Sequence, residues 1–372
     1  MIKGVPVIGA YVSSMLFGGE FPGTHIVARL YGLHILLIPA LILVFIAIHL
    51  FMVVIHKHTH FSGPGRRDDN VVGYPLMPVY VGKAGGFFFV VFGVLMLVAA
   101  TVSINPIWLY GSYDPSPVSA GTQPDWYIGW ADGALRLAPT HLEVVTGPYT
   151  WAWNILLPIL VLVVFMVVVA FYPFFEAWVT GDKREHHVLD RPRNAPTRTA
   201  IGAAGMTFYA VLWAGASTDL IATHFLLSLN GVLTTLQISL IVAPIIAFLV
   251  TKRVCLSLQR KDREIVLHGR ETGRIIRHPH GEYEEIHEAL PAHEMYKLVD
   301  FVDYQPTIAR PNAQGKITAS ARLRAAWSRF YFEDRVVPVT ATELAEAQSH
   351  HAHAEVEAAP AAKKTTKKAI AK

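Results

Sequence analysis

The stretch that decides the fold is LYGLHILLIPALILVFIAIHLFMVVI, residues 30–55. It is 26 residues long, almost wholly apolar, and interrupted by two histidines, His34 and His49. A segment this long and this poor in charge is typical of a helix that crosses a membrane. Pro39 lies inside it and is expected to kink the helix, which packed membrane helices tolerate. Burying a histidine at membrane depth costs free energy, so two histidines in one span are expected to have a specific role.

The spacing of the two histidines indicates what this role is. Fifteen residues at ~100° each return to within roughly 60° of the starting direction, so both imidazoles point to one side of a bundle. At ~1.5 Å per residue they lie roughly 22 Å apart, near the two edges of a ~30 Å hydrocarbon layer. This geometry suits two cofactors stacked across a membrane. The alternative for either histidine is a hydrogen-bonded packing role.

The composition of the whole chain indicates a multi-span membrane protein with a soluble appendage. Of the 372 residues, 52% are hydrophobic and 16% are charged, which excludes an ordinary soluble enzyme. The net charge of +4 is better explained by membrane-flanking loops than by nucleic acid binding. The single cysteine, Cys255, excludes an internal disulfide, a thiolate zinc site and covalent haem attachment through C-x-x-C-H. A metal cofactor would therefore be held mainly by histidine.

Apolar runs predict an all-α, polytopic bundle of about five membrane spans, at residues 30–55, 84–104, 151–175, 200–216 and 232–250. The loops after the first, third and fifth spans are rich in Lys and Arg, whereas the loops after the second and fourth hold one or none. The positive-inside rule places the basic loops in the cytoplasm. His34 then lies near the outer face and His49 near the inner face, and the loop 105–148 lies outside.

The segments outside the spans have their own compositions. Glycine and proline are dense in residues 1–28, which favours short interfacial helices and turns. Residues 251–341 are expected to form a cytoplasmic extension, in which residues 258–273 have the charge density of a surface helix. The Ala/Lys-rich tail, residues 342–372, is expected to be disordered.

The outer loop contains the segment QPDWYIGW, residues 123–130. Asp125 lies between Pro124 and Trp126, where desolvation would raise the affinity of the carboxylate for a proton and make it a proton acceptor. The alternative is an interfacial turn whose Trp and Tyr belong to the aromatic belt of the membrane.

These segments, taken in order, resemble a known family. GVPVIG (4–9), FGGEFPG (17–23), RLYGLH (29–34), the histidine pair and PDWY (124–127) resemble cytochrome b, the membrane subunit of quinol–cytochrome c oxidoreductase. The resemblance covers about residues 4–250. The extension and the loop GSYDPSPVSAGTQ (111–123) resemble the actinobacterial branch, whose quinol is usually menaquinol.

The resemblance implies a role for each matching residue. His34 would be an axial ligand of a low-potential haem b near the outer face, and His49 of a high-potential haem b near the inner face. Arg29 would lie near the first haem and the quinol pocket, and His56 would be a candidate for the inner quinone site. Residues 4–23 would form one wall of the outer pocket. The other wall would carry the family's PEWY motif, matched here by Pro124, Asp125, Trp126 and Tyr127.

The resemblance also implies an activity and partners. Quinol bound outside would give one electron to a Rieske iron–sulfur subunit and one to the outer haem, and the second electron would cross to the inner haem and reduce quinone. Asp125 would take a proton from the quinol, which couples the reaction to proton translocation. The implied assembly is a dimeric complex in the plasma membrane with a cytochrome c subunit, and with a terminal oxidase in a supercomplex.

The sequence departs from the family pattern at three places. Asp125 replaces the usual Glu and is shorter by one methylene. The second span opens with Lys83 and has no Asp, whereas the family's inner quinone site often uses a His and an Asp. The family's upstream spans, which carry the second axial histidine of each haem, are absent from these residues. We expect either that the sequence starts at an internal methionine of a longer gene or that a separate chain supplies those spans, and we favour the first.

Two functions of other classes remain as alternatives. The histidine pair would serve as a proton relay in a transporter or channel. A haem-free assembly or anchoring subunit would use a fragment that only resembles cytochrome b.

Overall fold

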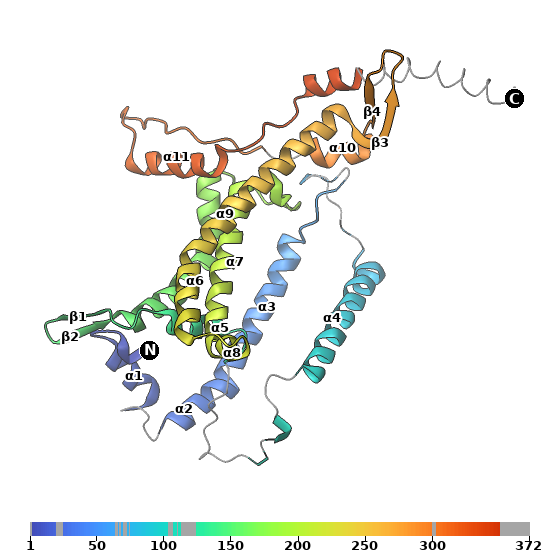
Figure 1. Cartoon of the computed structure of the whole chain (residues 1–372). Helices are drawn as coiled ribbons and strands as arrows, with labels where there is room; N and C mark the ends of the chain where they lie inside the picture. Colours follow the sequence, from blue (N-terminus) through green and yellow to red (C-terminus); the bar gives the residue numbers. More distant parts are fainter. Residues whose placement is uncertain are drawn as a thin grey trace. The chain divides into compact units, whose positions relative to one another are not determined.

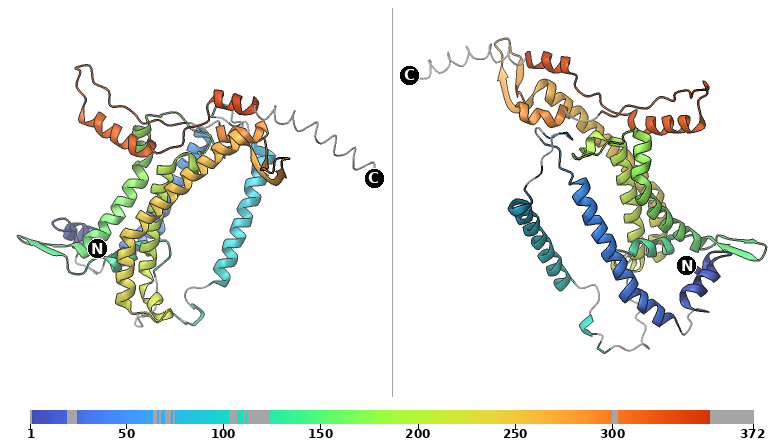
Figure 2. Two further views of the ribbon diagram at one scale, coloured as in Figure 1. Left: turned by 45° about the horizontal axis from the view of Figure 1, so that its top comes forward. Right: turned by 180° about the vertical axis from the view of Figure 1, so that it is seen from behind.

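The computed structural model describes residues 2–19, 25–63, 66, 68–69, 73, 75–102, 107–109, 111–112, 124–299 and 303–349. Contacts between backbone segments divide the chain into two units. The first unit comprises residues 1–58, 70–162 and 210–237, and the second comprises residues 59–69, 163–209 and 238–372. Helices and strands of both units are labelled in Figure 1, and Figure 2 gives two further views.

The prediction of a helical, five-span protein is confirmed, because five helices are long and apolar enough to cross a membrane. The first consists of α2 (Ile26–Gly32), η2 (Leu33–Leu37) and α3 (Ile38–His56). The second consists of η3 (Leu76–Tyr80) and α4 (Val81–Thr101). The other three are α6 (Trp153–Thr180), α7 (Pro196–Ala216) and α9 (Leu229–His268).

Short elements flank these helices. In the first unit they are η1 (Ile2–Gly4), α1 (Gly9–Phe17), η4 (Ile107–Leu109), α5 (Gly129–Leu137), α8 (Thr218–His224) and the antiparallel strands β1 (Glu143–Thr146) and β2 (Tyr149–Ala152). In the second unit they are η5 (Pro192–Asn194), β3 (Arg270–Arg277), β4 (Tyr283–Glu288), α10 (Ala292–Val299) and α11 (Ala319–Phe332). Strands β3 and β4 pair antiparallel, with an irregularity in register between Glu271 and Ile275.

The fifth span and the start of the extension differ from the sequence prediction. Helix α9 does not end near residue 250 but continues to His268. Residues 258–268, the first part of the predicted surface helix 258–273, therefore form the end of α9. The helix stops at Gly269, which has φ +85° and whose added Cβ would lie 2.7 Å from the carbonyl oxygen of Glu288. Only glycine accommodates both the left-handed backbone and this close approach. Residues 270–273 are therefore β-strand and not helix.

The start of the tail that is predicted to be disordered is ordered. Residues 341–349 are helical, and the helix starts with a capping box formed by Thr340 and Glu343. The N–H of Glu343 donates to Oγ1 of Thr340 at 3.3 Å, and the N–H of Thr340 donates to Oε2 of Glu343 at 2.9 Å. These reciprocal bonds satisfy N–H groups that the first turn leaves without helical partners. The remainder of the predicted tail, residues 350–372, lies outside the described residues.

Each unit has a small buried core. In the first unit the core lies where α5 meets α7 and the start of α9, and it contains Ala131, Ala134, Leu137, Leu212, Ala216 and Val232. In the second unit it includes Val179, Ala200, Cys255, Val266 and Tyr331. The apolar side chains of α3 and α4 are largely exposed, as expected of helices whose surroundings are lipid or other membrane helices.

Candidate functional site

A widened helical turn lies beside the first of the two histidines. The turn η2 is π-helical and contains His34, and Pro39 follows at the start of α3. Proline has no N–H, and its ring crowds the carbonyl four residues earlier, so a π turn just before it relieves the clash without breaking the helix. The kink expected from Pro39 is therefore taken up as a π turn.

The π turn alters the angle between the two histidines but leaves them on one side of the helix. An ideal α-helix rotates by a net ~60° over fifteen residues, and one residue added to a turn reduces that rotation by up to ~100°. His34 and His49 therefore stay within roughly 60° of each other in either case. Both side chains are exposed, so each can reach a group lying beside the helix.

Each imidazole suits one axial position on a haem. Among the residues that the structure describes, neither ring has a hydrogen-bonding partner, so a ring nitrogen is available as a ligand. Imidazole nitrogen is the usual protein ligand of haem iron. No group of three or more His, Cys, Asp or Glu in the described part of the chain is arranged to hold a metal ion. The fit therefore depends on the two histidines individually.

Arg29 connects two elements of the first unit. Its Nη1 donates to the carbonyl oxygen of Met15 at 2.6 Å, near the end of α1. Its guanidinium also lies so close to Gly18 that a Cβ there would be 3.0 Å from Cζ of Arg29. A cation at a helix C-terminus is favourable because the last carbonyls carry partial negative charge. Arg29 therefore ties α1 to the start of the histidine-bearing helix, and its predicted contact with haem or quinol stays a prediction.

The PDWY residues form a turn that leads into α5. The hydroxyl of Tyr127 donates to Oδ2 of Asp125 at 2.8 Å, and the rings of Trp126 and Tyr127 meet edge to face at 6.0 Å. The hydrogen bond to Asp125 and the negative charge of Asp125 raise the pKa of Tyr127, so the phenol remains a donor above neutral pH. Asp125, Trp126 and Tyr127 are exposed. The turn thus presents a carboxylate with one neutral donor already in place.

A tryptophan that the sequence analysis did not single out holds this turn. Nε1 of Trp213, on α7, donates to the carbonyl oxygen of Trp126 at 2.9 Å. Trp126 stands between Asp125 and Tyr127, so this bond fixes the backbone from which both side chains project. Trp213 is 87 residues away in the sequence, and no local pattern links it to the turn.

Two glycines of α5 allow α5 and α7 to approach closely. A Cβ on Gly133 would lie 1.6 Å from the carbonyl oxygen of Leu212, and a Cβ on Gly129 would lie 3.0 Å from the Trp213 ring. The spacing G-x-x-x-G places both glycines on one face of the helix. That spacing is the sequence signal for this packing.

Polar contacts hold the end of α5. Arg136, the single Lys or Arg of the predicted outer loop 105–148, pairs with Asp132 at 2.7 Å and with Asp219 of α8 at 3.0 Å. Nε2 of Gln237, on α9, donates to the carbonyl oxygen of Leu137 at 3.1 Å. The platform beneath the PDWY turn is therefore built from α5, α7, α8 and the start of α9.

The predicted inner-site candidate lies at the end of the first span. His56 is the last residue of α3, and Lys57, with φ 62°, ends the helix. Lys83, with which the second span opens and which is not accompanied by an Asp, lies near the start of α4. Both residues have interactions, and a role for His56 at a quinone stays a prediction.

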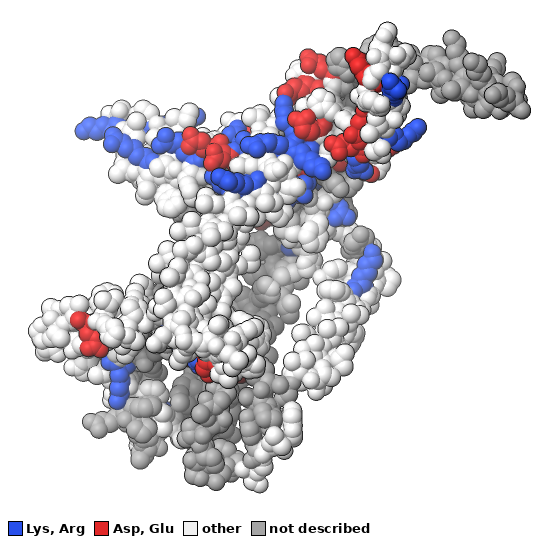
Figure 3. All heavy atoms as spheres, viewed as in Figure 1, with Lys and Arg blue, Asp and Glu red and all other residues white. Residues whose placement is uncertain are grey.

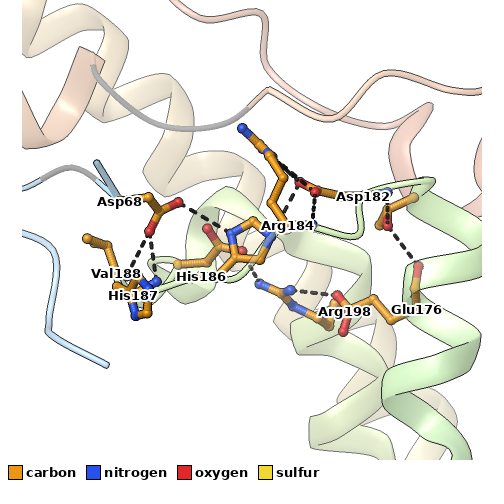
Figure 4. A network of polar contacts seen from close by, with 10 residues as sticks. Asp68, Glu176, Asp182, Arg184, His186, His187, Val188 and Arg198 are labelled. Carbon is orange, nitrogen blue, oxygen red and sulfur yellow. Dashed lines mark hydrogen bonds and ion pairs between the residues drawn. The ribbon is translucent and has the colours of Figure 1, made fainter. Parts of the chain in front are cut away.

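The basic loops of the second unit are internally paired (Figure 4). Asp68 accepts hydrogen bonds from the backbone N–H groups of His187 and Val188, both at 2.9 Å. The ring of His186 lies between Asp68, at 3.4 Å, and Asp182, at 3.3 Å. The hydrogen bond from Arg184 lowers the pKa of Asp182, so this carboxylate stays ionised. The loops after the first and third spans are therefore joined by charged contacts.

The same loops hold further ion pairs. Arg198 pairs with Glu176 at 2.6 Å and with Asp190 at 2.7 Å. Arg191 and Arg193 both pair with Asp262 of α9, at 2.8 and 2.9 Å. Because these groups are only partly exposed, the pairs order the loops more than isolated surface pairs would.

Comparison with known proteins agrees with these features. Residues 1–112 match the family model described as Cytochrome b(N-terminal)/b6/petB. The chain is 48% identical over 359 residues to the cytochrome bc1 complex cytochrome b subunit of Streptomyces coelicolor, covering 95% of this chain and 66% of that protein. The subunits so named from Streptomyces lividans and Mycobacterium leprae are each 44% identical, over 95% and 84% of this chain.

The chain is shorter than these relatives. It spans 66% of the length of the Streptomyces lividans subunit and 56% of the Mycobacterium leprae subunit. The similarity nevertheless extends over both units, from the histidine-bearing helix to the extension. This chain belongs to the cytochrome b family.

Proposed function

We propose that this chain is the membrane-embedded cytochrome b subunit of a respiratory quinol–cytochrome c reductase. It would oxidise quinol, of the menaquinol type, at an outer site and pass electrons across the membrane through two b haems, with coupled proton translocation. The observation that carries the proposal is the pair of exposed histidines on one side of a single apolar helix. In a member of the cytochrome b family, each histidine of the pair would be an axial ligand of a different haem.

The haem-binding residues of this chain would be His34 near the outer face and His49 near the inner face. When bound, the haems supply one-electron carriers at the two edges of the membrane. The helix holds its two imidazoles roughly 22 Å apart along its axis, and the π turn with Pro39 sets their relative direction. The second axial histidines would come from N-terminal cytochrome b helices outside this sequence.

The outer quinol site would be built on the PDWY turn. Asp125 would accept a proton from a quinol hydroxyl as general base. Tyr127 donates to one oxygen of Asp125, which leaves the other oxygen to face the substrate. Pro124 and Trp126 shape the turn, and residues 4–23 would form the opposite wall. Arg29 supports that wall through the carbonyl of Met15.

The inner end of the same helix would serve quinone reduction. His56 lies there, seven residues after His49, and an imidazole can form a hydrogen bond with a quinone oxygen. The proposed partners are a Rieske iron–sulfur subunit, a cytochrome c subunit and a terminal oxidase, in a dimeric complex of the plasma membrane. The extension would lie in the cytoplasm with the Lys- and Arg-rich loops.

The test is an optical spectrum of the complex purified with this chain, recorded as reduced minus oxidised. We expect a b-type absorbance band that His34→Ala and His49→Ala each reduce by about half, because each removes an axial ligand of one haem. His141→Ala, in an exposed turn between α5 and β1, is the control and should leave the band unchanged. A complete band in both variants, or no b-type band in the unaltered complex, would contradict the proposal.

A further inference from the structure

Helix α11 has three distinct faces. It runs from Ala319 to Phe332, and the hydroxyl of Thr318 caps its start by accepting from the N–H of Ala321 at 3.2 Å. At ~100° per residue, Leu323, Trp327 and Phe330 form one apolar stripe, and Arg322 and Arg329 lie on the next face. The third face is buried and includes Ser328 and Tyr331, which are 0% and 5% exposed.

The buried face and the edge of the apolar stripe pack on two membrane-spanning helices. The ring of Phe175, near the end of α6, lies 5.4 Å from Trp327 and 6.2 Å from Tyr331. Phe330 stacks on Phe248 of α9 at 6.2 Å. All these residues belong to the second unit. In both Figures 1 and 2, α11 lies across the end of α6 and not along it.

The contact points mark the level at which the two spans leave the apolar layer. Phe175 lies five residues before the end of α6 at Thr180, and Lys252 follows Phe248 by one turn of α9. Lys252 is also paired with Asp334, just after α11, at 2.7 Å. An amphipathic helix held at this level lies in the boundary between hydrocarbon and headgroups.

The apolar stripe of α11 is not fully covered by the protein. Leu323 is 55% exposed, Trp327 40% and Phe330 44%. The apolar side chains next to its contact points, Phe174 of α6 and Leu249 of α9, are 72% and 51% exposed. The stripe therefore continues the exposed apolar surface of the spans, and hydrocarbon is the medium that covers both.

The basic face of α11 has an excess of positive charge. Helix α11 holds three arginines and no Asp or Glu, and Glu333 follows directly after it. Arg324 packs on Gly181 at the end of α6, whereas Arg322 and Arg329 are exposed and make no ion pair with any residue in the described part of the chain. Figure 3 shows blue atoms along α11. Guanidinium groups on a helix at this depth match the phosphates of a lipid surface.

We propose that α11 is an interfacial helix that binds anionic phospholipid headgroups through Arg322 and Arg329, with Leu323, Trp327 and Phe330 inserted in the adjacent acyl region. The leaflet is the one on the side of the Lys- and Arg-rich loops, the cytoplasmic one. The inference rests on the membrane placement given under the proposed function, but not on haem or quinol chemistry.

The depth of α11 is tested with nitroxide labels on the full chain in vesicles of phosphatidylcholine and phosphatidylglycerol. In a Cys255→Ala background, Leu323→Cys and Arg322→Cys carry the label. Phe174→Cys is the lipid reference, and Arg274→Cys on β3 is the aqueous reference. We expect oxygen to relax the label at 323 as it does the lipid reference, and a water-soluble nickel complex to relax the label at 322.

Two outcomes of the depth measurement would overturn the proposal. A label at 323 that the nickel complex reaches as easily as the aqueous reference would place α11 in water. A label at 323 that neither reagent reaches would mean that another protein surface covers the stripe.

Headgroup preference is tested with a fluorophore on Ala326→Cys, between the two arginines. Doxyl-labelled phosphatidylglycerol should quench it more than doxyl-labelled phosphatidylcholine at the same mole fraction. Arg322→Gln/Arg329→Gln should lower that quenching ratio at least about threefold, while the charge-matched Lys261→Gln/Arg274→Gln should not. Equal quenching by the two lipids in the unaltered chain would overturn the proposal. The b-type spectrum should be the same in all these variants, so failure here is separate from failure of the proposed function.

Discussion

The carbonyl of Trp126 is the backbone group on which the PDWY turn depends. Trp213 donates to it at 2.9 Å, and the Asp125–Tyr127 hydrogen bond spans the same residue. The indole N–H of Trp213 donates to the backbone and not to the carboxylate of Asp125 or the phenol of Tyr127, so Trp213 is a positioning residue. Trp213 would affect the proposed reaction by orienting the side chain of Asp125.

Substitution Trp213→Phe keeps the ring packing and removes the indole N–H. We expect kcat for quinol–cytochrome c reduction to fall about tenfold per haem, with KM changed less than about twofold, because a displaced base costs rate more than binding. Asp125→Asn, which removes the proposed base itself, should lower kcat further than Trp213→Phe does. Steady-state kinetics on purified complex, normalised to the b-type absorbance, measure this.

The control for this substitution is Trp178→Phe, at the end of α6, whose ring contacts Phe175. It should leave kcat unchanged. If Trp213→Phe lowers only the amount of assembled complex and not the rate per haem, Trp213 has a structural role alone.

At the scale of elements, the close contact of α5 with α7 supports the turn. Gly133 faces the carbonyl oxygen of Leu212, and Gly215 of α7 faces the side chain of Leu137, where an added Cβ would lie 2.8 Å from Cδ1. At Gly133 backbone meets backbone because glycine has no side chain, and at Gly215 the missing side chain leaves room for Leu137.

Gly133→Ala is expected to push α5 away from α7, because a methyl group 1.6 Å from a carbonyl oxygen cannot be accommodated without a backbone shift. The cost is about 1–3 kcal/mol of stability, measured by thermal inactivation of the complex. Gly202→Ala on α7 is the matched control, since nothing lies within 4 Å of its added Cβ. There the better helix propensity of alanine should leave stability equal or slightly higher. Equal thermal stability of the two variants would show that α5 does not pack as described.

At the scale of the whole molecule, the distribution of charge predicts the topology. Lys and Arg gather in the loops after the first, third and fifth spans, and Arg136 is the single basic residue of the loop 105–148. Local pairing of those basic loops with Asp and Glu does not weaken the argument, since acidic residues contribute little to the rule.

The topology is measured with a membrane-impermeant maleimide on cells that express Cys255→Ser variants. His141→Cys, in the predicted outer loop, should be labelled in intact cells. Ser349→Cys, in the tail that follows the extension, should be labelled only after the membrane is opened. The cysteine-free chain is the control for background. The reverse pattern would place the basic loops outside and exchange the faces assigned to His34 and His49.

The sequence by itself determined the features that depend on local composition. Five apolar runs, the histidine spacing and the PDWY motif are properties of short segments, and they were sufficient to predict a helical, multi-span member of the cytochrome b family. The tertiary structure decided what depends on contacts between distant segments: the bond from Trp213 to Trp126, the close packing of Gly133 on α7, and the position of α11 on Phe175 and Phe248. It also decided the end of α9, because Gly269 faces a strand that forms later in the chain. Apolar length and charge act residue by residue, whereas a hydrogen bond or a close backbone contact exists only after the helices have packed.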